Sequence, residues 1–352
     1  MTNKLKKTDI KKTTNELLAS LSEKQRDVLV KRFGLKDGKR RTLEEIGRGY
    51  SITRERVRQI ENDAKAAFLK SKDVSKLDPF FEALSSHIDE KGGLRAEHHL
   101  LSSDLKEFFG KTTSEKEAAS LMYFLLNIGE QFLKTPETPT FHNVWSTKKS
   151  TVQITKKSLE ALVRKLENHK DTITKSELVS WLSEFVSSTE DKKALESYLS
   201  VSKDISSNAY EDYGLKHWPE ISTKGVRDKA YLVLKKHQKP MHFRFVVDQI
   251  NDKFKPTKKA HPQTVHNELI KDNKFILVGR GTYALSEWGY KPGTVSDVLK
   301  RILKDSKKPL SKPEILKAVL KERDVKENTI MLNLQNSDKF EKMGDGKYFY
   351  RA

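Results

Sequence analysis

A gapless internal repeat near the end of the chain constrains the fold more than any other feature of the sequence. QTVHNELIKDNKFILVGRGTYAL, from Gln263, aligns with NTIMLNLQNSDKFEKMGDGKYFY, from Asn328. The matching residues stand 65 positions apart: Thr264 and Thr329, Leu269 and Leu334, Phe275 and Phe340, Gly279 and Gly344, Gly281 and Gly346, Tyr283 and Tyr348. A repeat of this length indicates one supersecondary unit that is used more than once.

Each copy has the pattern of a small helical unit that ends in a hairpin. Apolar residues at helical spacing precede a strand, a Gly-x-Gly turn and a second strand. Upstream, KPMHFRFVVDQI and KPLSKPEILKAVL also correspond and supply an earlier helix. Three helices followed by a hairpin predict a winged helix, and the glycines suit the positive φ angles of a tight hairpin turn.

Weaker copies of the same order precede the repeat. Helices are expected at DPFFEALSSHI, HHLLSSDLKEFF and EKEAASLMYFLLNI, with a hairpin at QFLKTPETPTFHNVWST. Capping boxes mark three further helix starts, at Thr42 with Glu45, Thr174 with Glu177 and Ser311 with Glu314. The sequence predicts a mainly α fold of tandem helix-turn-helix and winged-helix (α+β) modules. Their expected ranges are 1–72 for the helix-turn-helix and 75–150, 151–222, 224–292 and 294–352 for the winged helices.

The charge is distributed unevenly over these modules. Residues 1–72 carry 20 Lys and Arg against 10 Asp and Glu, which gives a net charge of +10. Residues 73–223 carry 19 against 24 (net −5), and residues 224–352 carry 29 against 15 (net +14). Basic ends suit a polyanion such as nucleic acid or a membrane surface, and an acidic middle suits protein contacts.

Several chemistries find no support in the sequence. The chain has no cysteine, which excludes disulfides and thiolate metal sites. No apolar run approaches the roughly 20 residues of a membrane span. His98 and His99 are adjacent and cannot share one helix face, and no P-loop, nucleophile elbow or helical H-E-x-x-H is present. We therefore expect no metal, no cofactor and no enzymatic activity, and a cytoplasmic protein.

A helix-turn-helix is predicted from Thr42 onward. TLEEIGRGY forms one amphipathic helix, the chain turns at Ser51 and Ile52, and Thr53 can cap the next helix. The apolar residues of that second helix fall at spacings of three and four; they are Val57, Ile60, Ala64 and Phe68. The opposite face is expected to point outward; it carries Arg54, Glu55, Arg58, Gln59 and Asn62.

The residue types on that outer face fit the reading of bases in the major groove. Arg pairs bidentately with guanine, Gln pairs with adenine, and Glu accepts from the amino group of cytosine. Arg54, Glu55, Arg58 and Gln59 are the candidate reading edge, with Arg56 a phosphate or surface residue. Lys39, Arg40 and Arg41 precede the first helix, where they are candidates to hold phosphates. The alternative is an ordinary solvated helix with Glu–Arg pairs.

LSEKQRDVLVKRFGL, RRTLEEIG and ITRERVRQIE together resemble region four of the sigma-70 family of bacterial RNA polymerase sigma factors, over residues of about 15–70. The resemblance implies a helix that reads the −35 promoter element of double-stranded DNA and a domain that docks on the flap of the polymerase β subunit. It places Arg54, Glu55, Arg58 and Gln59 at contacting positions. Ser51 stands where the family usually has Gly. Nothing elsewhere resembles region two, so we do not expect a complete sigma factor.

GVRDKAYLVLKKHQKPMHFRFVVDQI and HPQTVHNELIKDNKFILVGRGTYALSEWGY, within residues of about 224–292, are similar to the HARE-type helix-turn-helix domain. That domain also forms the folded part of the delta subunit of bacterial RNA polymerase and occurs in chromatin and restriction proteins. The resemblance implies a winged helix with a nucleic-acid or polymerase role. Further DNA-contact candidates are Gln263, His266 and Asn267 on the third helix and Arg280 at the wing tip. Asp345, at the equivalent wing position of the last module, would be repelled there.

The leading hypothesis is a nucleoid-associated bacterial transcription factor that contacts promoter-like DNA and the RNA polymerase core. One alternative is a delta-like accessory subunit of the polymerase that acts mainly through protein contacts. Another is the DNA-specificity module of a restriction-type system. The sequence leaves open the DNA sequence recognised, the oligomeric state and the role of residues 73–223.

Overall fold

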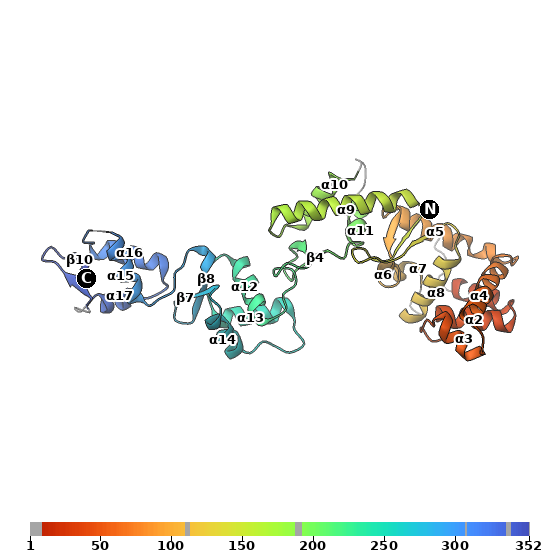
Figure 1. Ribbon diagram of the computed structural model, residues 1–352, viewed down its shortest axis with the longest axis horizontal. Helices are drawn as coiled ribbons and strands as arrows, with labels where there is room; N and C mark the ends of the chain where they lie inside the picture. Colours follow the sequence, from red (N-terminus) through yellow and green to blue (C-terminus); the bar gives the residue numbers. More distant parts are fainter. Residues whose placement is uncertain (1–8, 110–112, 187–191, 307, 336–338, 352) are drawn as a thin grey trace. The chain divides into compact units, whose positions relative to one another are not determined.

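The computed structural model describes residues 9–109, 113–186, 192–306, 308–335 and 339–351 (Figure 1). The chain divides into two compact units. The first runs up to Ser206 and includes Tyr213–Lys216, and the second comprises Ser207–Asp212 and the chain from His217 onward. Both contain mostly helices with small antiparallel sheets, which confirms the mainly α class with helix-turn-helix and winged-helix modules.

The first unit opens with helices and continues with two winged-helix patterns. The opening elements are α1 (Asp9–Ala19), α2 (Glu23–Phe33), α3 (Leu43–Tyr50), α4 (Arg54–Leu69) and the 3-10 turn η1 (Val74–Leu77). Next come α5 (Asp78–Asp89), β1 (Leu94–Ala96), α6 (Glu97–Leu100), α7 (Leu105–Phe108), α8 (Glu115–Ile128), β2 (Leu133–Thr135) and β3 (Val144–Ser146). The last are α9 (Lys149–His169), α10 (Lys175–Ser183), α11 (Lys192–Leu199), β4 (Ile205–Ser207) and β5 (Tyr213–Leu215).

The second unit holds the two copies of the sequence repeat. The first copy contains α12 (Val226–His237), β6 (Met241–His242), α13 (Phe243–Phe254), α14 (Pro262–Lys271), β7 (Phe275–Gly279), β8 (Thr282–Leu285) and the 3-10 turn η2 (Ser286–Trp288). The second copy contains α15 (Val295–Asp305), α16 (Lys312–Glu322), α17 (Glu327–Leu334), β9 (Phe340–Lys342) and β10 (Tyr348–Tyr350). Each copy has its own apolar core, centred on Val265 and Tyr283 in one and on Ile315 and Ile330 in the other.

One strand order recurs in these winged-helix patterns. The segment between the first and second helix pairs with the second hairpin strand, as Leu94 does with Ser146 and Met241 with Tyr283. Single bridges take the same place elsewhere, from Ile173 to Tyr213 and from Leu310 to Tyr348. The three capping boxes expected from the sequence are confirmed at the starts of α3, α10 and α16. Local sequence therefore sets the helix starts, and the hairpin closes each pattern.

An aromatic cluster gives the opening helices and the first winged-helix pattern a common core. The ring of Phe124, on α8, lies 5.1 Å from that of Phe33 on α2 and 5.3 Å from that of Phe68 on α4. The Arg40 guanidinium lies 4.2 Å from the centroid of the Tyr123 ring, also on α8. One contiguous cluster of buried residues runs from Ile10 to Trp145. Helices α2 and α4 of the helix-turn-helix thus pack on α8, whereas Ile46 of α3 belongs to a separate small cluster.

A second close contact holds α11 on β1. The Ser197 hydroxyl donates to the Leu94 carbonyl over 2.9 Å, and the Tyr198 hydroxyl donates to the Gly92 carbonyl over 2.9 Å. Gly92 has φ +82°, and a Cβ there would lie 2.6 Å from the Tyr198 hydroxyl. A left-handed backbone with no room for a side chain requires glycine at this position.

We predict that Phe124→Ala destabilises the helix-turn-helix together with the first winged-helix pattern. Truncating a fully buried phenylalanine typically costs about 3–5 kcal/mol. Hydrogen exchange of the full chain should show faster exchange over residues 10–146 and unchanged exchange over 226–285. Phe185→Ala, at an exposed phenylalanine of the same unit, is the control and should change little. Loss of protection confined to α8 would contradict the shared core.

Candidate nucleic-acid interface

The turn between α3 and α4 has the geometry of a helix-turn-helix. Ser51 ends α3 in the left-handed region at φ 54°, where the sequence departs from glycine. Thr53 caps α4 by accepting from the Arg56 amide over 3.2 Å. Gly47 lets the turn approach α3, because a Cβ there would lie 2.7 Å from the Ile52 carbonyl oxygen. The residues expected at the turn and cap are confirmed in those places.

The buried stripe of α4 is also confirmed. Its members Val57, Ile60, Ala64 and Phe68 are buried. Val57 and Ile60 pack with Val28 and Ile46 in a small cluster between α2, α3 and α4. Because this stripe faces the protein, the opposite side of α4 faces outward, and Arg54, Glu55, Arg56, Arg58 and Gln59 are all exposed.

Side chains on the outer face of α4 are paired with one another. Arg58 donates from Nε and Nη2 to the Glu55 carboxylate over 2.6–3.1 Å. Arg56 donates from Nη1 to the Gln59 Oε1 over 3.0 Å. Within the described residues, Arg54 makes no hydrogen bond or ion pair. Exposed pairs of this kind contribute little stability. Their side chains can therefore break these contacts and form hydrogen bonds to a base edge instead.

Two contacts that sequence reasoning missed, one of them with a buried carboxylate, hold α2 against α3 and α4. Glu61, on α4, is buried and accepts from Arg32 Nε over 3.2 Å and from Lys65 Nζ over 2.6 Å. The Tyr50 hydroxyl donates to Asp27; burial, followed by the neighbouring carboxylate, raises the pKa of Tyr50 to about 12. Neither long-range pair falls on a sequence period, so no local signal identifies it.

In the basic segment before α3, Arg40 and Arg41 already have contacts within the protein, whereas the sequence suggested that they were available to phosphates. Arg41 is half-buried, and its Nη2 donates to the Asp37 carboxylate over 2.9 Å. Its carbonyl accepts from Arg32 Nη1 over 3.0 Å. Arg40 stacks on Tyr123, as described above. A phosphate at this segment would compete with these contacts.

The candidates on α14 differ in their surroundings. Gln263 and Asn267 are exposed, and Gln263 Nε2 donates to Asn267 Oδ1 over 2.9 Å. His266 departs from the expected outward position. Its ring stacks on Phe243 at 4.6 Å between centroids and meets the edge of Tyr283 at 5.9 Å. Helical spacing alone could not show that α13 and the wing enclose this ring.

Arg280 lies at the wing turn between β7 and β8 and is exposed, as predicted. Gly281 follows it with φ +73°, and a Cβ there would lie 2.8 Å from His242 Nε2, so glycine is required. At the equivalent turn of the last module, the Asp345 carboxylate pairs with Lys347 Nζ at 3.0 Å. The two wings therefore present opposite charges at equivalent positions.

The third helix of a winged helix is the usual reading element, and these helices differ in burial along the chain. On α8 the buried residues fall on several faces; they are Ala118, Ser120, Leu121, Met122, Phe124, Leu125, Leu126 and Ile128. Of the eight residues of α11, Ala194, Leu195, Ser197 and Tyr198 are buried. By contrast, α14 buries Val265 and Leu269 alone among its ten residues. The acidic middle of the chain thus uses its third helices for packing.

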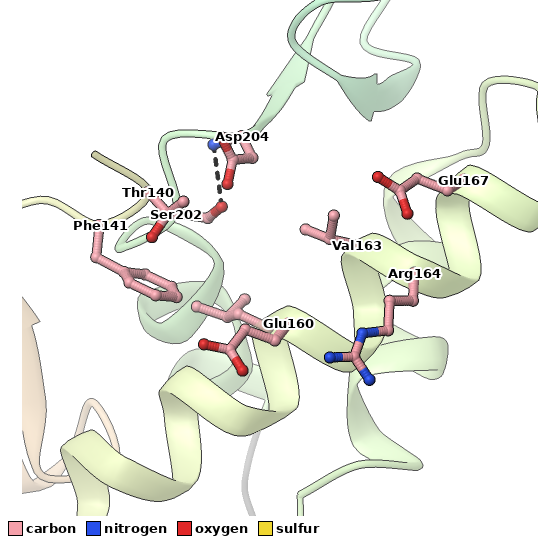
Figure 2. A pocket seen from close by; sticks show the side chains of 9 residues that line it. Thr140, Phe141, Glu160, Val163, Arg164, Glu167, Ser202 and Asp204 are labelled. Carbon is pink, nitrogen blue, oxygen red and sulfur yellow. Dashed lines mark hydrogen bonds between the residues drawn. The ribbon is translucent and has the colours of Figure 1, made fainter. Parts of the chain in front are cut away.

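A pocket of about 270 Å³ lies beside α9 in the first unit (Figure 2). Glu160, Glu167 and Asp204 line it, with Arg164 as the cationic side chain of the lining. Its volume falls below the about 300–1,000 Å³ typical of small-molecule sites, and its negative charge disfavours phosphate. Across the described residues, no group of His, Asp and Glu could hold a metal ion. In the same part of the chain, no helix is long and apolar enough to cross a bilayer.

We predict that Arg58→Ala raises the pKa of Glu55. Hydrogen bonds from Arg58, then the charges of Arg58 and Arg54, hold that pKa below the ordinary value of 4.5. The contribution of the pair to stability is therefore present above the ordinary carboxyl pKa and is lost as pH falls through the lowered one. NMR titration of the Glu55 side chain measures the shift. Arg48→Ala, on α3, should leave the pKa of Glu55 unchanged, and an equal shift in both variants would contradict the pairing.

Comparison with known proteins agrees with both resemblances. Residues 17–67 match the family model described as sigma-70, region 4, and residues 226–288 match the HARE-HTH model, an HTH domain whose description names ASXL and restriction endonuclease. RNA polymerase sigma factor SigA of Listeria monocytogenes is 49% identical over 55 residues, which are 16% of this chain and 15% of that protein. RNA polymerase sigma-C factor of Nostoc sp. is 40% identical over 81 residues, 23% of this chain and 20% of that protein. The chain thus spans between about a seventh and a fifth of these relatives. It combines a segment similar to sigma region 4 with a segment similar to the HARE-type domain.

Proposed function

We propose that this chain is a non-enzymatic, DNA-binding transcription factor that acts together with a bacterial RNA polymerase. The observation that carries the proposal is the outer face of α4. Arg54, Glu55, Arg58 and Gln59 stand exposed on a capped helix whose other side is buried, in the segment similar to sigma region 4. This arrangement supports insertion of α4 into the major groove of a promoter-like element similar to the −35 element.

A second DNA contact is proposed at the HARE-type module. The exposed Gln263 and Asn267 on α14 and Arg280 on the wing are the candidate groups, in a part of the chain with a net charge of +14. Phosphate neutralisation by such residues makes binding salt-dependent, because bound counterions are released. The protein contact proposed for the helix-turn-helix is the flap of the polymerase β subunit.

An accessory role in which residues 73–223 contact protein is the second candidate. Two observations favour it for this part of the chain: its net charge is −5, and α8 and α11 are occupied by packing. Capture of RNA polymerase that survives nuclease treatment, with no DNA binding by the purified chain, would support this role over direct DNA reading.

The first test is base readout by α4. A DNA site selected with the parent chain should bind Arg54→Ala and Arg58→Ala about 5- to 150-fold more weakly, the usual range for a specific contact, and with reduced sequence preference. Fluorescence anisotropy at several salt concentrations measures both effects. Arg164→Ala removes an exposed arginine from the acidic middle and should bind as the parent does. Parent-like binding by both α4 variants would exclude base readout by this helix.

The second test concerns the wing. Arg280→Ala should weaken binding similarly on all sequences and reduce the slope of log affinity against log salt by about one, as loss of a phosphate contact does. Lys347→Ala is the matched control on the other wing, where the ammonium already pairs with Asp345. If the two variants changed the slope equally, the wing contact of Arg280 would be wrong.

A further inference from the structure

The segment that joins the two copies of the repeat is packed against the first copy. Trp288 and Tyr290 cover one side of the hairpin, where they pack on Ile276, Val278 and Ala284. This side is opposite the core that α12, α13 and α14 form on the same sheet. Trp288 and Tyr290 are half-buried there, so the start of this segment could move only if their rings left an apolar surface.

The backbone of the last module also pairs with β7. The Asp324 amide donates to the Val278 carbonyl over 2.8 Å, and Gly279 and Asp324 form a parallel bridge. A Cβ on Gly279 would lie 2.5 Å from the Asp324 carbonyl oxygen. The hairpin glycine with positive φ is Gly281, not Gly279 as the repeat suggested; Gly279 is required by its contact with the neighbouring module.

Arg323 connects the last module to the segment that precedes it. Its side chain is 3% exposed, although arginine is rarely buried without partners. Its Nη2 donates to the carbonyls of Lys291 over 2.7 Å and Gly293 over 3.1 Å, and its Nη1 to the carbonyl of Glu322 over 2.8 Å. A guanidinium has donors in a fixed planar fork, so it can hold these carbonyls in one arrangement.

We infer that Arg323 is a positioning residue, which with Asp324 and Gly279 fixes the last two winged helices as one rigid recognition body. The inference goes beyond the proposed function and does not depend on DNA as the partner. A partner bound to α14 then meets α17 at a set distance, without the entropic cost of a flexible linker.

The two faces presented by this body differ in chemistry. The repeat aligns Asn267 on α14 with Leu332 on α17, and Leu332 is 68% exposed. It also aligns Arg280 with Asp345 on the wings. Exposed polar and cationic side chains on one module and an exposed leucine on the other are thus held together. If the two modules are fixed relative to one another, the distance between these exposed groups is set by the protein and not by the partner.

The test measures the distance between the modules in the full chain. Because the chain has no cysteine, Lys253→Cys on α13 and Lys317→Cys on α16 accept two spin labels at exposed positions without further changes. Double electron–electron resonance should give one narrow distance distribution. Arg323→Ala should broaden it, and so should Gly279→Ala, which blocks the bridge while Arg323 remains.

Amide spectra show whether each module still folds, as its separate core predicts. Lys321→Ala, at an exposed lysine near the end of α16, is the control and should keep the distribution narrow. A broad distribution in the parent would overturn the inference, as would a narrow one in both joint variants. Because the measurement contains no DNA, its outcome is distinguishable from a failure of the proposed DNA binding.

Discussion

The contact of Phe124 with Phe33 and Phe68 is the interaction on which the N-terminal site depends. It joins α8 to the apolar sides of α2 and α4, at ring separations of 5.1 and 5.3 Å. Phe68 is also the last member of the buried stripe of α4. The same packing that forms the core therefore fixes which side of α4 is exposed. Arg56 and Arg58 do not position the helix, since they pair with their neighbours Gln59 and Glu55 on its outer face.

Burial of the third helices divides the modules by role. α8 and α11 lie within the packing of the first unit, whereas α4 and α14 keep a polar side exposed. The charge along the chain follows the same division, with an acidic middle between two basic parts. Since a helix buried on several faces cannot enter a groove, α8 is not a candidate reading helix, and the proposed DNA contacts lie in the basic ends of the chain.

Much of the site could be predicted because its signals are local. The stripe from Val57 to Phe68 depends on helical periodicity, and the boxes at Thr42, Thr174 and Ser311 depend on residues three positions apart. His266 could not be placed in this way. Its neighbours Phe243 and Tyr283 come from other elements, and only folding brings the three rings together. The sequence placed Arg58 and Glu55 on the same outer face of the helix. It did not decide whether they pair with each other or contact bases.

The sequence by itself determined the helix starts, the repeated three-helix-and-hairpin order and the outward side of α4. These depend on short-range backbone and side-chain preferences and on the period of apolar residues. Only the tertiary structure decided that α8 is shared by two modules, that Glu61 on α4 pairs with Arg32 on α2, and that Arg323 is buried at the joint. Such contacts connect residues far apart in the chain or modules with separate cores. The partners in these contacts depend on how the folded helices and strands pack, and the periodicity of the sequence does not show this.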